Sequence, residues 1–185
     1  MKAWRKKWVL FGGFIVLLGA CSTFLWRASS RSEAPSKAGA VQPKTGADNP
    51  DHELKALAME LQKKPGHIPV LMRMAQIERQ QGKLEDAAGH LRQVVESEPA
   101  NADGFLELGR ILYEKGDVAG AIAQTGKALA VNPKHVDALY NMGAIYANTG
   151  DPAKARSYWT KAVEANPAAE SGKKAREGLT RIGKG

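Results

Sequence analysis

Apolar side chains recur with the period of an α-helix through residues 68–167, and short polar turns interrupt them. Phe105, Leu108 and Leu112 follow the i, i+3, i+7 spacing that places side chains on one face of a helix. Ala121 and Leu129 continue the same spacing after a Gly-Asp turn. The pattern predicts a helix, a short turn and a second helix.

This unit occurs three times at an interval of 34 residues, and a proline at the end of each copy marks the interval. They are Pro99, Pro133 and Pro167, and Pro65 lies one further interval upstream. Other positions align on the same interval: Leu71, Phe105, Leu139; Met74, Leu108, Met142; Ala75, Gly109, Gly143; Gly82, Gly116, Gly150; Ala87, Ala121, Ala155; Val94, Ala128, Ala162. The sequence therefore contains an internal repeat, with copies at residues 68–101, 102–135 and 136–167.

The residues at the helix ends support these boundaries. Asp117 and Asp151 are well placed as N-caps, and Pro152 follows at a position where its missing N–H costs nothing. Each closing proline is expected to stop a second helix. The small residues of the Ala75 column and the Ala87 column allow the two helices of a copy to approach closely.

The 34-residue spacing, with a bulky residue, a small residue four places later, then Gly, Ala, Ala and Pro, resembles the tetratricopeptide repeat family. The resemblance covers residues 68–167 and implies an all-α fold, a short right-handed α-solenoid of three helix-turn-helix repeats with a capping helix at each end. Glu78 stands where the family usually has a large apolar residue, and Thr125 stands at the place of Leu91 and Trp159. Gly120 and Gly126 lie within the same helix as Thr125, so this helix is predicted to be the weakest element.

Two flanking segments have the character of end caps. In residues 51–66, Leu54, Leu57 and Leu61 share one face and Pro65 ends the run, which suits half of a repeat. In residues 168–185, Leu179 and the apolar residues around it oppose a lysine- and arginine-rich face, which suits a solvating C-terminal helix.

The N-terminal region has a different composition. Four basic residues precede the 19 uncharged residues 8–26, which as a helix would be roughly 28 Å long, close to the thickness of a bilayer. Residues 1–27 are therefore expected to be a single-pass anchor with a cytoplasmic N-terminus and the repeats in the periplasm or outside. The rival interpretation is a lipoprotein attached through Cys21, because Leu18-Gly19-Ala20-Cys21 resembles a lipobox. Residues 28–50, rich in Ser, Ala, Gly, Pro and Lys, are expected to form a flexible linker.

The net charge of +8 is concentrated at the ends of the chain. Residues 1–50 carry eight Lys and Arg against Glu33 and Asp48, residues 51–167 carry 14 against 15 acidic residues, and residues 168–185 carry five against two. Because the repeats are close to neutral, no basic footprint for nucleic acid is expected.

No catalytic motif is present in the sequence, and no cofactor is expected. His52, His67, His90 and His135 are not spaced as metal ligands and are interpreted as surface or cap residues. The protein is predicted not to be an enzyme.

The resemblance instead implies a binding groove lined by the first helix of each copy. Carried over residue by residue, the family pattern assigns the groove to Met72, Gln76, Arg79, Gln80, Asp103, Leu106, Arg110, Tyr113, Glu114, Asp137, Tyr140, Ala144, Ala147 and Asn148, with Asn141 beside them. Arg79 and Arg110 are candidates for holding a carboxylate, and Tyr113 and Tyr140 for gripping an extended peptide.

These features predict a membrane-tethered, non-catalytic adaptor that binds a protein or peptide partner in the groove, in the assembly of an envelope complex. Two alternatives stay open. One is an assembly factor similar in layout to those of cytochrome c biogenesis, which hold an apocytochrome. The other is a self-associating structural protein, or a lipoprotein of pilus or outer-membrane assembly.

Overall fold

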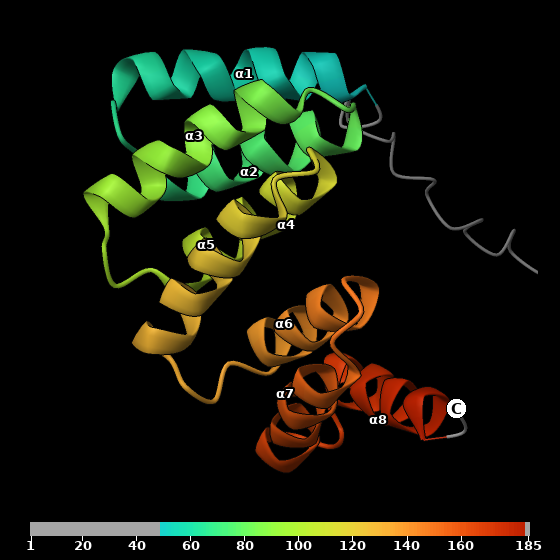
Figure 1. Cartoon of the computed structure of the whole chain (residues 1–185). Helices are drawn as coiled ribbons and strands as arrows, with labels where there is room; N and C mark the ends of the chain where they lie inside the picture. The colour runs from blue at the N-terminus through green and yellow to red at the C-terminus, as the bar shows by residue number, and fades with distance from the viewer. Residues whose placement is uncertain (1–48, 184–185) are drawn as a thin grey trace, which may run out of the picture. The chain divides into compact units, whose positions relative to one another are not determined.

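The computed structural model describes residues 49–183, which form eight α-helices and no strand (Figure 1). The helices are α1 (Pro50–Lys63), α2 (Ile68–Gln80), α3 (Leu84–Ser97), α4 (Ala102–Glu114), α5 (Val118–Val131), α6 (Val136–Asn148), α7 (Pro152–Ala165) and α8 (Glu170–Ile182). Successive helices pack as antiparallel pairs, α2 with α3, α4 with α5 and α6 with α7. This part of the chain is an all-helical solenoid, as the sequence predicts.

The helix ends form as the cap residues predict. Asp117 accepts a hydrogen bond from the Gly120 N–H at 2.8 Å, and Asp151 accepts one from the Lys154 N–H at 3.0 Å. Between the helices of the second pair, Gly116 has a φ of +85°, and the Asp117 N–H returns to the Leu112 carbonyl at 2.9 Å. The glycine column of the sequence therefore marks the turns inside the pairs.

Within the second and third pairs, a glycine in the first helix touches a side chain of the second. A Cβ placed on Gly109 would lie 2.6 Å from Thr125 Oγ1, and one on Gly143 would lie 2.5 Å from Trp159 Cδ1. Real side chains do not occupy such distances, so the two helix backbones are as close as the facing residue allows. The small-residue column thus sets the separation of the helices in a pair.

Trp159 joins three helices at the C-terminal end. Its ring packs against Gly143 of α6 and Gly178 of α8, and its Nε1–H donates to the Tyr140 carbonyl at 3.1 Å. The Tyr140 and Trp159 rings are stacked with centroids 6.5 Å apart. Helix α8 is therefore seated on the same side chain that holds the third pair together.

The second and third pairs are joined through α4, α5 and α6. Phe105, Leu106, Ala128 and Ala138 form a buried apolar cluster of residues from α4, α5 and α6. At one end of α4, His135 Nε2 lies 2.9 Å from Asp103 Oδ1, and at the other the Asn148 amide donates to the Tyr113 hydroxyl at 2.9 Å. His135 also caps α6, because its Nδ1 accepts from the Ala138 N–H at 3.4 Å.

Helix α1 packs on α2 but contains no fully buried residue. Arg73 of α2 forms a two-pronged contact with Glu53, with nitrogen to oxygen distances of 2.6 and 3.0 Å. The Gln81 amide donates to Asp51 at 2.9 Å. Polar contacts therefore provide much of the attachment of α1.

Glu78 is buried although the family pattern favours an apolar residue there. The side chain of this residue in α2 lies with its Oε1 3.3 Å from Nε2 of His90 in α3. Burial raises the pKa of the Glu78 carboxyl, which nearby Asp86 reinforces, whereas His90 and Lys83 oppose the shift.

Helix α5 is continuous over 14 residues despite Gly120 and Gly126. Thr125 is fully buried, and its hydroxyl has no hydrogen-bond partner among the described residues. The expectation that α5 is the weakest element has a physical basis in this unpaired hydroxyl and in the two glycines.

The predicted anchor at residues 1–27, with Cys21, and the predicted linker up to residue 48 lie outside the described residues. Within residues 49–183, no helix combines the length and the apolar character needed to cross a membrane.

We predict opposite effects for alanine at two glycines of the second pair. Gly109→Ala should lower the free energy of unfolding by about 1–3 kcal/mol, because its Cβ would meet Thr125 and the Ala121 carbonyl at 3.2 Å. Gly126→Ala, whose Cβ would meet nothing within 4 Å, should raise it by about 0.5–1 kcal/mol. Urea unfolding followed by circular dichroism measures both, and equal effects of the two changes would contradict the packing described above.

We predict that Glu78 makes stability fall as pH rises. Its pKa is raised in the folded state, so its contribution is complete below the pKa of the unfolded chain and is lost as pH rises through the folded pKa. Glu78→Gln, which cannot ionise, should therefore gain stability relative to the parent between about pH 4 and pH 7. Urea unfolding across this range measures the difference. Glu96→Gln, at an exposed residue, is the control for removing one negative charge. The prediction would be wrong if the free energy of unfolding of the parent rose with pH relative to that of Glu78→Gln.

Candidate functional site

A cavity of about 750 Å³ lies between α2 and α4, and we call it the inner groove. Its walls include Met72, Gln76 and Arg79 from α2 and Glu107 and Arg110 from α4. Ala75, Leu91 and Ile111 form an apolar floor. The groove therefore combines an apolar base with charged walls, which is a combination suited to binding a polypeptide.

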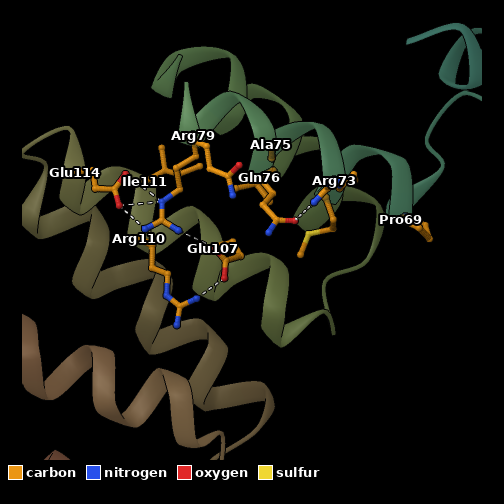
Figure 2. Close-up of a pocket in the computed structure, with 12 residues that line it drawn as sticks. Pro69, Arg73, Ala75, Gln76, Arg79, Glu107, Arg110, Ile111 and Glu114 are labelled. Atoms are coloured by element: carbon orange, nitrogen blue, oxygen red, sulfur yellow. Dashed lines mark hydrogen bonds and ion pairs between the residues drawn. The ribbon is translucent and has the colours of Figure 1, made fainter. Parts of the chain in front are cut away.

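A network of charged side chains crosses the inner groove (Figure 2). The Arg79 guanidinium donates from Nε to both Glu114 carboxylate oxygens, at 2.9 and 3.1 Å, and its Nη1 lies 3.6 Å from Glu107. Arg110 pairs with the other oxygen of Glu107. Both arginines are thus held in position by carboxylates of the chain itself.

The carboxylate partners of Arg79 favour its charged form. The hydrogen bond with Glu114 raises the pKa of Arg79, and the nearby charge of Glu107 acts in the same direction. The Arg79 side chain is 35% exposed and that of Arg110 is 27% exposed, so a ligand can reach both. A carboxylate brought by a ligand would compete with Glu107 and Glu114 for these guanidinium groups.

At the end of the groove nearer α1, Arg73 connects the site to the first helix. In addition to its contact with Glu53, its Nη1–H donates to the Gln76 side chain at 3.0 Å (Figure 2). The hydrogen bond with Glu53 raises the pKa of Arg73.

The structure brings six of the predicted groove residues together. Met72, Gln76, Arg79, Gln80 and Arg110 all line the cavity. Glu114 lines it as well. These residues of the first two copies therefore form a single surface.

The other predicted residues have different surroundings. Leu106 is 2% exposed and packs in the cluster with Phe105, Ala128 and Ala138, so it is not available to a ligand. Tyr140 and the partly buried Ala144 and Ala147 pack against the cluster around Trp159, and Asp103 contacts His135. Tyr113 and Asn148 are hydrogen-bonded to each other. Asp137 and Asn141 are partly buried on α6 and do not line the cavity.

Arg73 and Glu107 are lining residues that were not assigned to the groove from the sequence. Both lie on the 34-residue interval with Asn141, which was placed beside the groove. Extending that column through the three copies would have identified them.

No three side chains of His, Cys, Asp or Glu in residues 49–183 are grouped so that they could hold a metal ion. The polar groups of the inner groove are instead ion-paired arginines, carboxylates and glutamines, which are hydrogen-bond donors and acceptors. The stacked helix pairs and the cavity between their first helices define a helical repeat protein of the interaction type.

Family comparison identifies the repeats. Models described as tetratricopeptide repeat match residues 72–129 and 136–169, and one described as TPR repeat matches residues 109–150. The chain therefore contains tetratricopeptide repeats and has the fold of a protein-interaction adaptor. No curated protein matches it in sequence.

Solved structures share the fold at low identity. A crystal structure of MamA is 22% identical with a TM-score of 0.61, and the match covers 73% of this chain and 85% of that one. MamA 41-end from Desulfovibrio magneticus RS-1 is 19% identical with a TM-score of 0.59, covering 65% and 68%. The first TPR of Spaghetti (RPAP3), bound to the HSP90 peptide SRMEEVD, is 19% identical with a TM-score of 0.58, covering 63% and 90%.

Proposed function

We propose that the protein is a non-catalytic adaptor that holds an extended segment of a partner protein in the inner groove. The observation that carries the proposal is the groove itself, an open cavity of about 750 Å³ with an apolar floor and arginines fixed on its walls. The fold likeness to the RPAP3 TPR, whose structure contains a peptide, supports this use of the fold.

The charges of the groove indicate which segments it favours. Arg79 is shared between Glu114 and Glu107, while Arg110 pairs with Glu107 alone. A carboxylate of the partner can replace Glu107 at Arg110 while Glu114 still neutralises Arg79. We therefore propose a partner segment that places one acidic group at Arg110 and apolar side chains over Ala75 and Ile111.

We predict that peptides selected on the parent protein from a displayed random library depend on the groove. Arg110→Ala combined with Gln76→Ala, both in the cavity lining, should weaken the binding of a selected, fluorescently labelled peptide about tenfold or more, as loss of a central anchor does. Fluorescence anisotropy measures the affinity.

Arg176→Ala, at an exposed arginine of α8 outside the cavity lining, is the matched control and should leave the affinity unchanged. Selected peptides that bind the double variant as tightly as the parent would refute groove binding.

We also propose that the repeats are tethered to a membrane by an uncleaved anchor at residues 8–26. The support is the run of 19 uncharged residues behind four basic ones. The tether would confine the adaptor to partners that assemble at the membrane surface.

We predict that the full chain stays with membranes after an alkaline carbonate wash, and that Val16→Arg releases it. A charged residue near the middle of a span costs about 2.5–3.5 kcal/mol of insertion free energy. Cys21→Ser should leave the fraction of the chain bound to membranes unchanged. It should change the mass of the chain only by the difference between cysteine and serine. A lipid mass that Cys21→Ser removes would instead favour the lipoprotein alternative.

A further inference from the structure

A second cavity, of about 420 Å³, lies between α3, α4 and α5, and we call it the outer hollow. Its lining includes Phe105, Leu108 and Leu112 of α4, with Val95 of α3 and Gln124 of α5 beside them. No residue of its lining is shared with the inner groove. The outer hollow is therefore a separate, largely apolar depression of a size that admits a ligand.

The 34-residue interval explains why this space is open in the second repeat. The positions of Leu112, Gly120 and Gln124 correspond to Tyr146, Lys154 and Tyr158 in the third repeat. There the two tyrosine rings stack with centroids 5.7 Å apart, and the Lys154 ammonium lies 4.8 Å from the Tyr146 ring centroid.

In the first repeat, the corresponding residues are Glu78, Asp86 and His90. Glu78 and His90 contact each other, and Asp86 lies near enough to act on the charge of Glu78. Two repeats thus occupy this position with large side chains of their own. The second repeat has a leucine, a glutamine and a glycine, so side-chain volume is missing there.

One polar atom at the outer hollow lacks its partner. The Gln124 Oε1 is buried and has no hydrogen-bond donor among the described residues. Leaving a buried carbonyl oxygen without a donor costs free energy. A ligand whose O–H or N–H donates to this oxygen would therefore bind more tightly. Gln124 corresponds in position to Tyr158, which belongs to the aromatic stack.

The charges at the rim are balanced. Arg92 and Lys127 are opposed by Glu96 and Asp117. The Lys127 ammonium lies 5.5 Å from the Phe105 ring centroid, as the Lys161 ammonium lies 5.5 Å from that of Tyr158. The outer hollow therefore has one aromatic ring, the largely buried Phe105, in its lining and balanced charges at its rim, which favours a neutral group.

We propose that the outer hollow binds a tyrosine-like side chain presented by a partner protein. Its ring occupies the space that the chain fills with stacked tyrosines in the third repeat, beside Phe105 and Leu108, and its hydroxyl donates to Gln124 Oε1 once that amide turns toward the hollow. The protein then has two docking sites on opposite sides of α4, the inner groove for an extended segment and the outer hollow for a single aromatic anchor.

N-acetyltyrosinamide and N-acetylphenylalaninamide test this site, because they differ only in the hydroxyl group. Each is titrated into the full chain and followed by ¹H–¹⁵N NMR at the amides of Gly120 and Gln124. The tyrosine compound should bind about threefold to tenfold more tightly, the ratio that one neutral hydrogen bond supplies. Equal affinities, or no saturable shift at these amides, would overturn the proposal.

Three variants test separately the hydrogen bond to Gln124, the empty space of the outer hollow and its independence from the inner groove. Gln124→Leu should remove the preference for tyrosine while leaving the phenylalanine compound unaffected. A triple variant that copies the third repeat should abolish binding of both compounds; it combines Leu112→Tyr, Gly120→Lys and Gln124→Tyr. If this triple variant does not fold, Gln124→Leu still tests the proposal. Arg110→Ala with Gln76→Ala should bind both compounds as the parent does, so failure of the inner-groove proposal is distinguishable from failure of this one. If the triple variant folds and still binds either compound, the outer hollow is not the binding site.

Discussion

The close approach of the two helices in each pair is the constraint on which the rest of the structure depends. Gly109 and Gly143 lack a Cβ where Thr125 and Trp159 press against the neighbouring backbone. In the first pair, Ala75 and Leu91 occupy the corresponding positions and share one buried cluster. Because the backbones meet at this point, the remaining side chains of the first helix are directed to its two flanks, where the inner groove and the outer hollow form.

Much of the fold could be predicted from the sequence because its determinants are local and repeated. Helix periodicity, the aspartate caps and the turn glycines each act within a few residues, and the interval of 34 repeats them. The site was less predictable. Arg79 and Glu114 were both assigned to the groove, but their pairing joins residues 35 apart in sequence and depends on how two repeats stack. Leu106 was assigned to the groove by its place in the repeat, yet the next repeat covers it in the core.

The two flanks of the pairs differ in how far they are shared between repeats. The inner groove combines residues of α2 and α4, so each of its contacts depends on two repeats at once. On the outer flank, the three residues that fill the space come from one repeat alone, as Tyr146, Lys154 and Tyr158 do. These three positions belong to a single repeat, although Arg92, Val95 and Glu96 of the preceding repeat also line the outer hollow.

The attachment of α1 has a consequence for how the solenoid opens. Its contacts through Glu53 and Asp51 lie at the surface, where dissolved ions screen them, whereas α8 is fixed by the buried ring of Trp159. Rising ionic strength therefore loosens the N-terminal end before the C-terminal end. We therefore expect hydrogen exchange to spread inward from α1 while α6 to α8 stay protected.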